Sequence, residues 1–146
     1  MRSSGVTPLV NDAVIIERDG QTIAFAGIDD YYNGSPDLEK AREAAPNADY
    51  TVLVSHTPDI LPDIDAPFFE LLLCGHTHGG QVAPFGFAPR SSSNYGNRYR
   101  SGWFHEKNVD MLVSNGVGTS ILPIRLGAEP QYHLLTFKSS RQQQEQ

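Results

Sequence analysis

Two histidines separated by one residue, His76 and His78, follow a run of apolar residues, and a third, His56, ends an earlier apolar run. Imidazole is the commonest protein ligand for Zn, Mn and Fe, so histidines that converge on one point can bind such an ion. Two positions apart on an extended segment, His76 and His78 would lie on the same side. Gly75, between the run and His76, would let the backbone approach an ion closely. The other interpretation is a set of ordinary hydrogen-bonded histidines at strand ends.

The two apolar runs have the pattern of buried strands. Residues 50–56 and 68–75 are almost continuously apolar, as in parallel strands that are covered on both faces. The connection between them is rich in proline and is expected to be a loop with one helical turn. The carboxyl ends of parallel neighbours meet at one edge of a sheet, where open α/β sheets bind ligands. The sequence therefore predicts that His56 lies close to His76 and His78.

The remaining pattern predicts one α/β unit with more strands than helices. Strands are expected near 12–18 and 21–28 around an Asp19-Gly20 turn, and then near 99–106, 109–115 and 131–137. A helix is expected from Pro36, with Ser35 as its N-cap. Residues 83–98 are expected to form a long surface loop. Three aromatic residues beside this loop are expected in the core: Tyr99, Trp103 and Phe104.

Composition limits the classes of function. The 146 residues suit one domain, and the formal charge of −6 argues against a nucleic-acid-binding surface. The single cysteine excludes an intramolecular disulfide. No segment reaches the length of a membrane span and the N-terminus does not resemble a signal peptide, so we expect a cytoplasmic protein. The alternative is that a missing N-terminal part could have carried a targeting or membrane segment. The polar residues 139–146 are predicted to be a disordered tail.

Several other residues have two interpretations each. Asp29 and Asp30 could orient a metal-binding histidine, or they could satisfy backbone N–H groups in a turn. Cys74 is expected to be a small buried residue beside the site. A further set of residues on the long loop could contact a phosphate or could simply be solvated: Arg90, Asn94, Tyr95, Arg98 and Arg100.

Longer motifs resemble a known superfamily. The segments SHTPD at 55–59 and CGHTHGGQV at 74–82 resemble the last two motifs of the calcineurin-like metallophosphoesterases. The string GHTHGGQ and the later GVGTS at 116–120 are similar to the bacterial branch typified by YkuE- and YaeI-type proteins, and so is GIDD at 27–30. The resemblance covers about residues 9 to 137, so 1–138 is predicted to be a phosphoesterase domain.

The resemblance implies the C-terminal half of an α/β/β/α sandwich and a ligand set for two metals. His56 and His76 would bind the second metal, His78 would bind the first, and Gly75 would allow close approach. Asp29 and Asp30 remain possible partners of these ligands. The family's D-x-H, G-D and G-N-H-[DE] motifs do not occur in the 146 residues. The bridging aspartate and the histidine that protonates the leaving group belong to those motifs.

The function implied by the resemblance is metal-dependent hydrolysis of a phosphomonoester or phosphodiester with Mn, Zn or Fe, incomplete in this chain. We expect one ion at most, and weak activity or none, from the chain alone. The substrate would be a phosphorylated small molecule or a lipid-linked phosphodiester. Two alternatives are a non-catalytic metal-binding or interaction module and a truncated product that needs a partner chain. An apolar face left open would favour self-association or a complementing N-terminal half.

Overall fold

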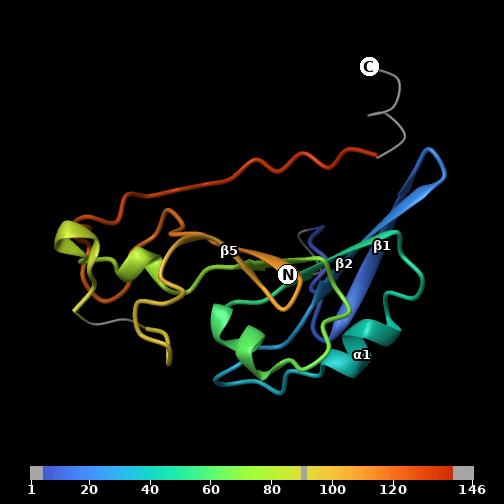
Figure 1. Cartoon of the computed structure of the whole chain (residues 1–146), viewed down its shortest axis with the longest axis horizontal. Coiled ribbons are helices and arrows are strands. Elements are labelled where there is room, and N and C mark those ends of the chain that lie inside the picture. The colour runs from blue at the N-terminus through green and yellow to red at the C-terminus, as the bar shows by residue number, and fades with distance from the viewer. Residues whose placement is uncertain (1–4, 90–91, 140–146) are drawn as a thin grey trace.

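The computed structural model describes residues 5–89 and 92–139, and its centre is one mixed six-stranded sheet (Figure 1). The strands occur in the order β1-β2-β3-β4-β6-β5 across the sheet. Pairs β2–β3, β3–β4 and β4–β6 are parallel, while β1–β2 and β5–β6 are antiparallel. The strand bounds are β1 Asp12–Arg18, β2 Gln21–Gly27, β3 Tyr50–Val54, β4 Leu71–Cys74, β5 Gly102–Glu106 and β6 Val109–Val113.

Few helical elements accompany the sheet, so the predicted strand-rich α/β fold is confirmed. The only α-helix of the described chain is α1, and the other helical elements are short 3-10 turns. No helix in the described ranges is long and apolar enough to cross a membrane. The bounds are α1 Leu38–Glu43, η2 Pro58–Asp63, η3 His78–Gly80 and η4 Pro84–Gly86.

The first hairpin forms as its turn residues predict. Asp19 and Gly20 both have positive φ, of 54° and 73°, which the tight two-residue turn of a hairpin requires. The register pairs Arg18 with Gln21 at the turn and Asp12 with Gly27 at the far end. The parallel pairing of β3 with β4, on which the site prediction depends, is also confirmed.

The start of α1 differs from the prediction. Asp37, not Ser35, is the N-cap, and its carboxylate accepts a hydrogen bond from the Lys40 N–H at 3.0 Å. Pro36 therefore lies before the helix and not at its first position. A carboxylate is a strong acceptor and is favoured at the positive end of the helix dipole, which explains why the N-cap lies two residues later than predicted.

The predicted strand at 131–137 is wrong. This segment is not part of the sheet, although Gln131 N–H donates to Gly116 O at 2.9 Å. It runs as an extended chain over one face of the sheet, shown in red in Figure 1. The aromatic ring of Phe137 contacts Phe25 of β2 and Tyr50 of β3, with ring centroids 6.1 and 5.8 Å apart. Side-chain contact with the face of the sheet replaces pairing at an edge.

The main core lies on the opposite face of the sheet. α1 and η2 cover this face (Figure 1) and pack against apolar residues of the central strands. The core residues Leu53, Leu72, Met111 and Tyr99 are fully buried. Trp103 corrects a prediction, because it is 58% exposed. It lies on the edge strand β5 and pairs with Leu112, on the face away from α1.

Candidate metal site at the carboxyl edge of the sheet

His56 and His76 meet at the carboxyl edge of β3 and β4. Each histidine lies two residues beyond the end of its strand, and the two strands are parallel neighbours. The backbone N–H of Gly75 donates to His56 O at 3.1 Å, which joins the two strand exits. His56 Nε2 and His76 Nδ1 are 3.0 Å apart, and the ring centroids are 4.8 Å apart. The two parallel runs therefore bring together the pair that the sequence predicts.

His78 faces a different segment. It begins the short turn η3, and its Nδ1 lies 3.3 Å from Gly118 O. Within residues 5–89 and 92–139, no group of three or more His, Cys, Asp or Glu side chains is arranged to hold a metal ion. A site that includes His78 together with the histidine pair stays a prediction.

The backbone after β4 is unusual for residues other than glycine. His76 and His78 have φ of 68° and 53°, in the left-handed region that side chains rarely adopt. The next two residues, Gly79 and Gly80, also have positive φ. A Cβ on Gly79 would lie 2.5 Å from Asn115 Oδ1, so this position has no room for a side chain. A Cβ on Gly75 would come no closer than 4.0 Å to His56 O, so the fold itself does not require that glycine.

Asp59 is a residue of the site that the sequence prediction missed. Its carboxylate is fully buried and accepts three hydrogen bonds. The donors are Ser93 Oγ at 2.6 Å, Asn94 N at 2.5 Å and Tyr32 Oη at 2.5 Å. Asp59 thus ties the long loop and Tyr32 to the first turn after His56. Its place in the SHTPD segment, three residues after His56, was the signal in the sequence.

Tyr32 closes one side of the histidine pair. Its ring lies against His76, with the centroids 5.4 Å apart, and its hydroxyl points to Asp59. Burial, followed by the hydrogen bond to Asp59, raises the pKa of Tyr32 to about 12. The phenol is therefore neutral at physiological pH and donates to the carboxylate. From the other direction, Ser92 O lies 3.3 Å from His76 Nε2.

Asp29 and Asp30 mainly satisfy backbone groups in a turn. Asp29 accepts from the N–H groups of Asp30 and Ser35, and Asp30 accepts from those of Tyr32 and Asn33. Hydrogen bonds from Asn33 and Tyr32 hold the pKa of Asp30 below its ordinary value, and the charge of His56 acts in the same direction. Asp30 therefore stays ionised and contributes negative charge near the histidines without contacting them.

The electrostatics of His76 favour its neutral form. Burial comes first and the neighbouring charge of His56 second in lowering the pKa of His76. The Ser92 carbonyl and the carboxylates of Asp59 and Asp30 act in the opposite direction. A neutral imidazole is the form that binds a metal ion. The nearby carboxylates add a negative potential that would stabilise a bound cation.

Two of the arginines on the long loop have protein partners. Arg98 makes two 3.0 Å hydrogen bonds to the carboxylate of Glu106. Arg100 donates to Gly79 O at 2.7 Å, directly after the histidine motif. Arg90 lies outside the described residues. Arg100 is thus the arginine of this set that the structure places beside the histidine loop.

Cys74 is the small buried residue that the sequence predicts beside the site. It lies at the end of β4, is buried, and its Sγ is 3.4 Å from Thr57 O. Burial is the main cause that raises the pKa of the Cys74 thiol far above its ordinary value. The thiol is therefore protonated at physiological pH.

The donor set fits part of a metal site. Two nitrogens that each lie about 2.0–2.1 Å from one tetrahedral ion are separated by about 3.3 Å. The 3.0 Å between His56 Nε2 and His76 Nδ1 is close to this separation. Two imidazoles leave the other coordination positions of such an ion to groups beyond this pair.

Comparisons with known proteins find several relatives of the chain. It is 36% identical to "Uncharacterized metallophosphoesterase YkuE" of Bacillus subtilis over 84% of the chain and 43% of that protein. It is 32% identical to "Phosphodiesterase YaeI" of Escherichia coli over 92% of the chain and 48% of that protein. It is also 36% identical over 93% of its length to "Uncharacterized protein YpbG" of Bacillus subtilis, of which it covers 50%.

Over most of its length the chain is therefore similar to proteins named metallophosphoesterase and phosphodiesterase. It spans about half the length of these three curated relatives. This coverage agrees with the prediction from the motifs that the chain corresponds to the C-terminal half of a phosphoesterase domain. No protein-family model matches the chain, and no solved structure is significantly similar to it.

Proposed function

We propose that the chain forms part of a metal-dependent phosphoesterase site. The observation that carries this proposal is the contact of His56 with His76 at the carboxyl edge of two parallel strands. Both histidines lie in the motifs that resemble the metallophosphoesterases. The names of its relatives, which include a phosphodiesterase, support hydrolysis of a phosphate ester.

His56 and His76 would hold a divalent cation, which in this family would be Mn, Zn or Fe. When bound, such an ion polarises a phosphoryl oxygen and lowers the pKa of a water molecule. The protein residues prepare the site for it. Burial keeps His76 neutral, Tyr32 packs against its ring, and Asp59 fixes Tyr32 and the 92–94 segment in place. His78 is proposed as a ligand of a further ion.

The proposed substrate is a phosphomonoester or phosphodiester on a small molecule or a lipid. Activity of the chain alone should be weak, because the motif that contributes the leaving-group acid does not occur in its sequence. Loss of a general acid costs about 10²–10⁴ in rate. A complementing polypeptide that carries the missing motifs would supply the rest of the site.

Hydrolysis of bis(p-nitrophenyl) phosphate with Mn²⁺ tests this proposal. We expect slow turnover that a chelator stops and that His76→Ala removes. His105→Ala is the matched control, because His105 is an exposed histidine paired with Asp110 on the β5–β6 hairpin. Turnover that survives both the chelator and His76→Ala would contradict the proposal. Metal binding without any turnover would favour the non-catalytic module instead.

A further inference from the structure

The end of the molecule next to His78 exposes large apolar side chains on two loops. Phe85, at the tip of the loop 82–87, is 107% exposed, and Ile121, on the loop 117–126, is 99% exposed. Phe87, Val117 and Leu122 are also exposed on these loops. Large apolar side chains that project fully into water are costly to the isolated protein and mark interaction surfaces. We call these two loops the apolar loop end.

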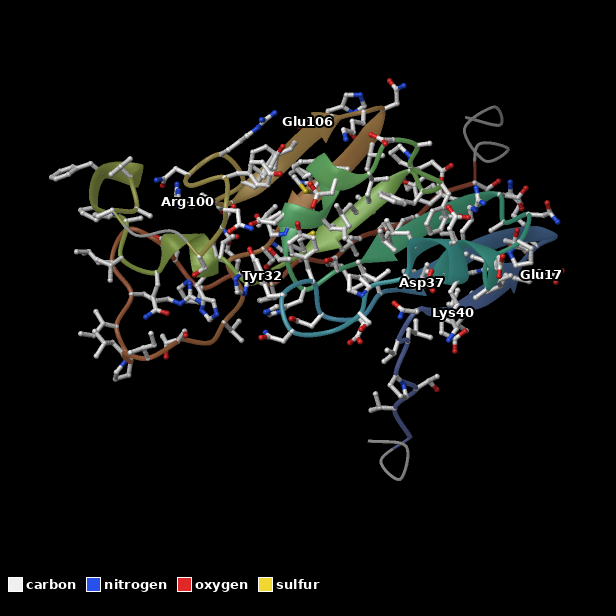
Figure 2. The ribbon with its side chains drawn as sticks, turned by 90° about the horizontal axis from the view of Figure 1, so that it is seen from below. Glu17, Tyr32, Asp37, Lys40, Arg100 and Glu106 are labelled. Carbon is white, nitrogen blue, oxygen red and sulfur yellow. The ribbon has the colours of Figure 1, made fainter. Side chains whose placement is uncertain are left out.

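The two loops form one surface. Ala83 N–H donates to Leu126 O at 2.7 Å, and Leu126 N–H donates to Gln81 O at 2.9 Å. The side-chain amide of Gln81 donates to the carbonyls of Ser120 and Leu122. Figures 1 and 2 show the loops side by side at one end of the molecule. The exposed side chains are therefore held together on a fixed backbone.

Charge is unevenly distributed between this end and the rest of the chain. Residues 71–105 and 111–128 contain four arginines and no Asp or Glu, so the other segments carry a formal charge of −10 within the net charge of −6. Arg125 is anchored beside the loops by donating to Gly118 O and Asn115 O. Figure 2 shows Arg100 towards this end and Glu17 and Asp37 at the opposite end. The resulting dipole would turn the apolar loop end towards an anionic surface.

From these observations we propose that the apolar loop end docks on a bilayer that contains anionic lipids. Phe85 and Ile121 enter the interface between headgroups and acyl chains, and Arg100 and Arg125 lie at the level of the lipid phosphates. Apolar side chains with flanking basic residues and no carboxylates are the features that bind peripheral proteins to anionic membranes. A protein partner would also cover apolar surface, but the loops 82–87 and 117–126 carry no Asp or Glu, which favours an anionic surface. The docking does not depend on metal binding or hydrolysis.

Flotation with phosphatidylglycerol–phosphatidylcholine vesicles in chelator tests the docking directly. The full chain should float with these vesicles and should bind more weakly to pure phosphatidylcholine. Phe85→Ser with Ile121→Ser should weaken binding by a factor of about ten per side chain. Leu134→Ser is the matched control, because Leu134 is 89% exposed but lies on the segment over the sheet. Absence of flotation, or equal loss in the control, would overturn the proposal.

A second measurement does not depend on a loss of binding. In a Trp103→Phe background, Phe85→Trp should place the only tryptophan of the chain at the loop tip. Vesicles with brominated acyl chains should quench this tryptophan and should leave Trp103 of the unchanged chain unquenched. No quenching at position 85 would overturn the proposal. The proposal would also be overturned if Phe85→Ser with Ile121→Ser removed an oligomer in light scattering and left vesicle binding unchanged.

Discussion

Asp59 is the residue on which the arrangement around the histidine pair most depends. Its buried carboxylate satisfies a serine hydroxyl, a tyrosine hydroxyl and a backbone N–H from segments more than 25 residues away in the chain. Without Asp59, each of these donors would lose a charged acceptor. The neighbouring Asp63 also accepts from a tyrosine, Tyr31, but it is exposed to water.

We expect Asp59→Ala to lower the free energy of unfolding by about 2–4 kcal/mol, because buried donors left without partners each cost about 1–3 kcal/mol. Asp63→Ala should change it by less than about 1 kcal/mol, since water replaces the exposed carboxylate. Urea unfolding of both variants measures the difference. Equal destabilisation would contradict the role assigned to Asp59.

Cys74 gives a test of burial at the end of β4. Because its thiol is buried and its pKa is raised, the folded protein should react with iodoacetamide far more slowly than the protein unfolded in urea at the same pH. Mass spectrometry of the alkylated protein measures both rates. Rapid labelling at pH 8 without denaturant would show that β4 opens to solvent.

At the scale of elements, two strand exits and one helix start show what local sequence can and cannot determine. The parallel neighbours β3 and β4 and the turn of the β1–β2 hairpin follow from apolar runs and the Asp-Gly pair. The helix start did not, because Ser35, Pro36 and Asp37 are all favourable near a helix N-terminus. The long-range bond from Asp37 N–H to Asn11 Oδ1, at 3.0 Å, is not visible in a local pattern.

Asp37→Ala should destabilise the protein by about 1 kcal/mol through loss of the cap on α1. Ser35→Ala should destabilise the protein by only a few tenths of a kcal/mol, because Ser35 is exposed and is not the cap. Serine is favourable at an N-cap, but here it does not occupy that position. Thermal unfolding followed by circular dichroism compares the two variants. A larger effect at Ser35 would restore the helix start expected from the sequence.

In the candidate site, too, some features follow from local sequence and others depend on long-range contacts. The contact of His56 with His76 could be predicted, because it needs only two parallel strands of known direction. The roles of Asp59 and Tyr32 could not, because their partners come from the 92–94 segment and from the turn after β2. The error at 131–137 has a related cause. An alternating apolar segment packs equally well over the face of a sheet as beside its edge.

For the whole molecule, the face of the sheet away from α1 remains partly uncovered. Strand register places Val14, Val54 and Trp103 on this face, through their pairing with Phe25, Leu73 and Leu112. All three are exposed, and the segment with Phe137 covers only part of the sheet. Among the described residues, no further strand pairs with the outer edges of β1 and β5. Both edges are therefore open to pairing with another chain.

We predict that this face drives self-association or binding of a complementing chain. Covering about 500 Å² of apolar surface is worth about 12 kcal/mol before the entropy of association is subtracted. Val14→Lys with Trp103→Lys should shift the chain towards a monomer in light scattering. Phe85→Ser, on the apolar loop end, should leave this association unchanged. A monodisperse monomer that melts cooperatively and binds no hydrophobic dye would contradict this prediction.

The central claim is that His56 and His76 form a metal site, and calorimetric titration with Mn²⁺ or Zn²⁺ tests it most directly. We predict weak binding of at most one ion per chain, abolished by His76→Ala and unchanged by the matched variant His105→Ala. Tight uptake of two ions would mean that further carboxylates, with Asp29 and Asp30 the first to test, act as ligands. Binding that His76→Ala leaves intact would contradict the assignment of the site.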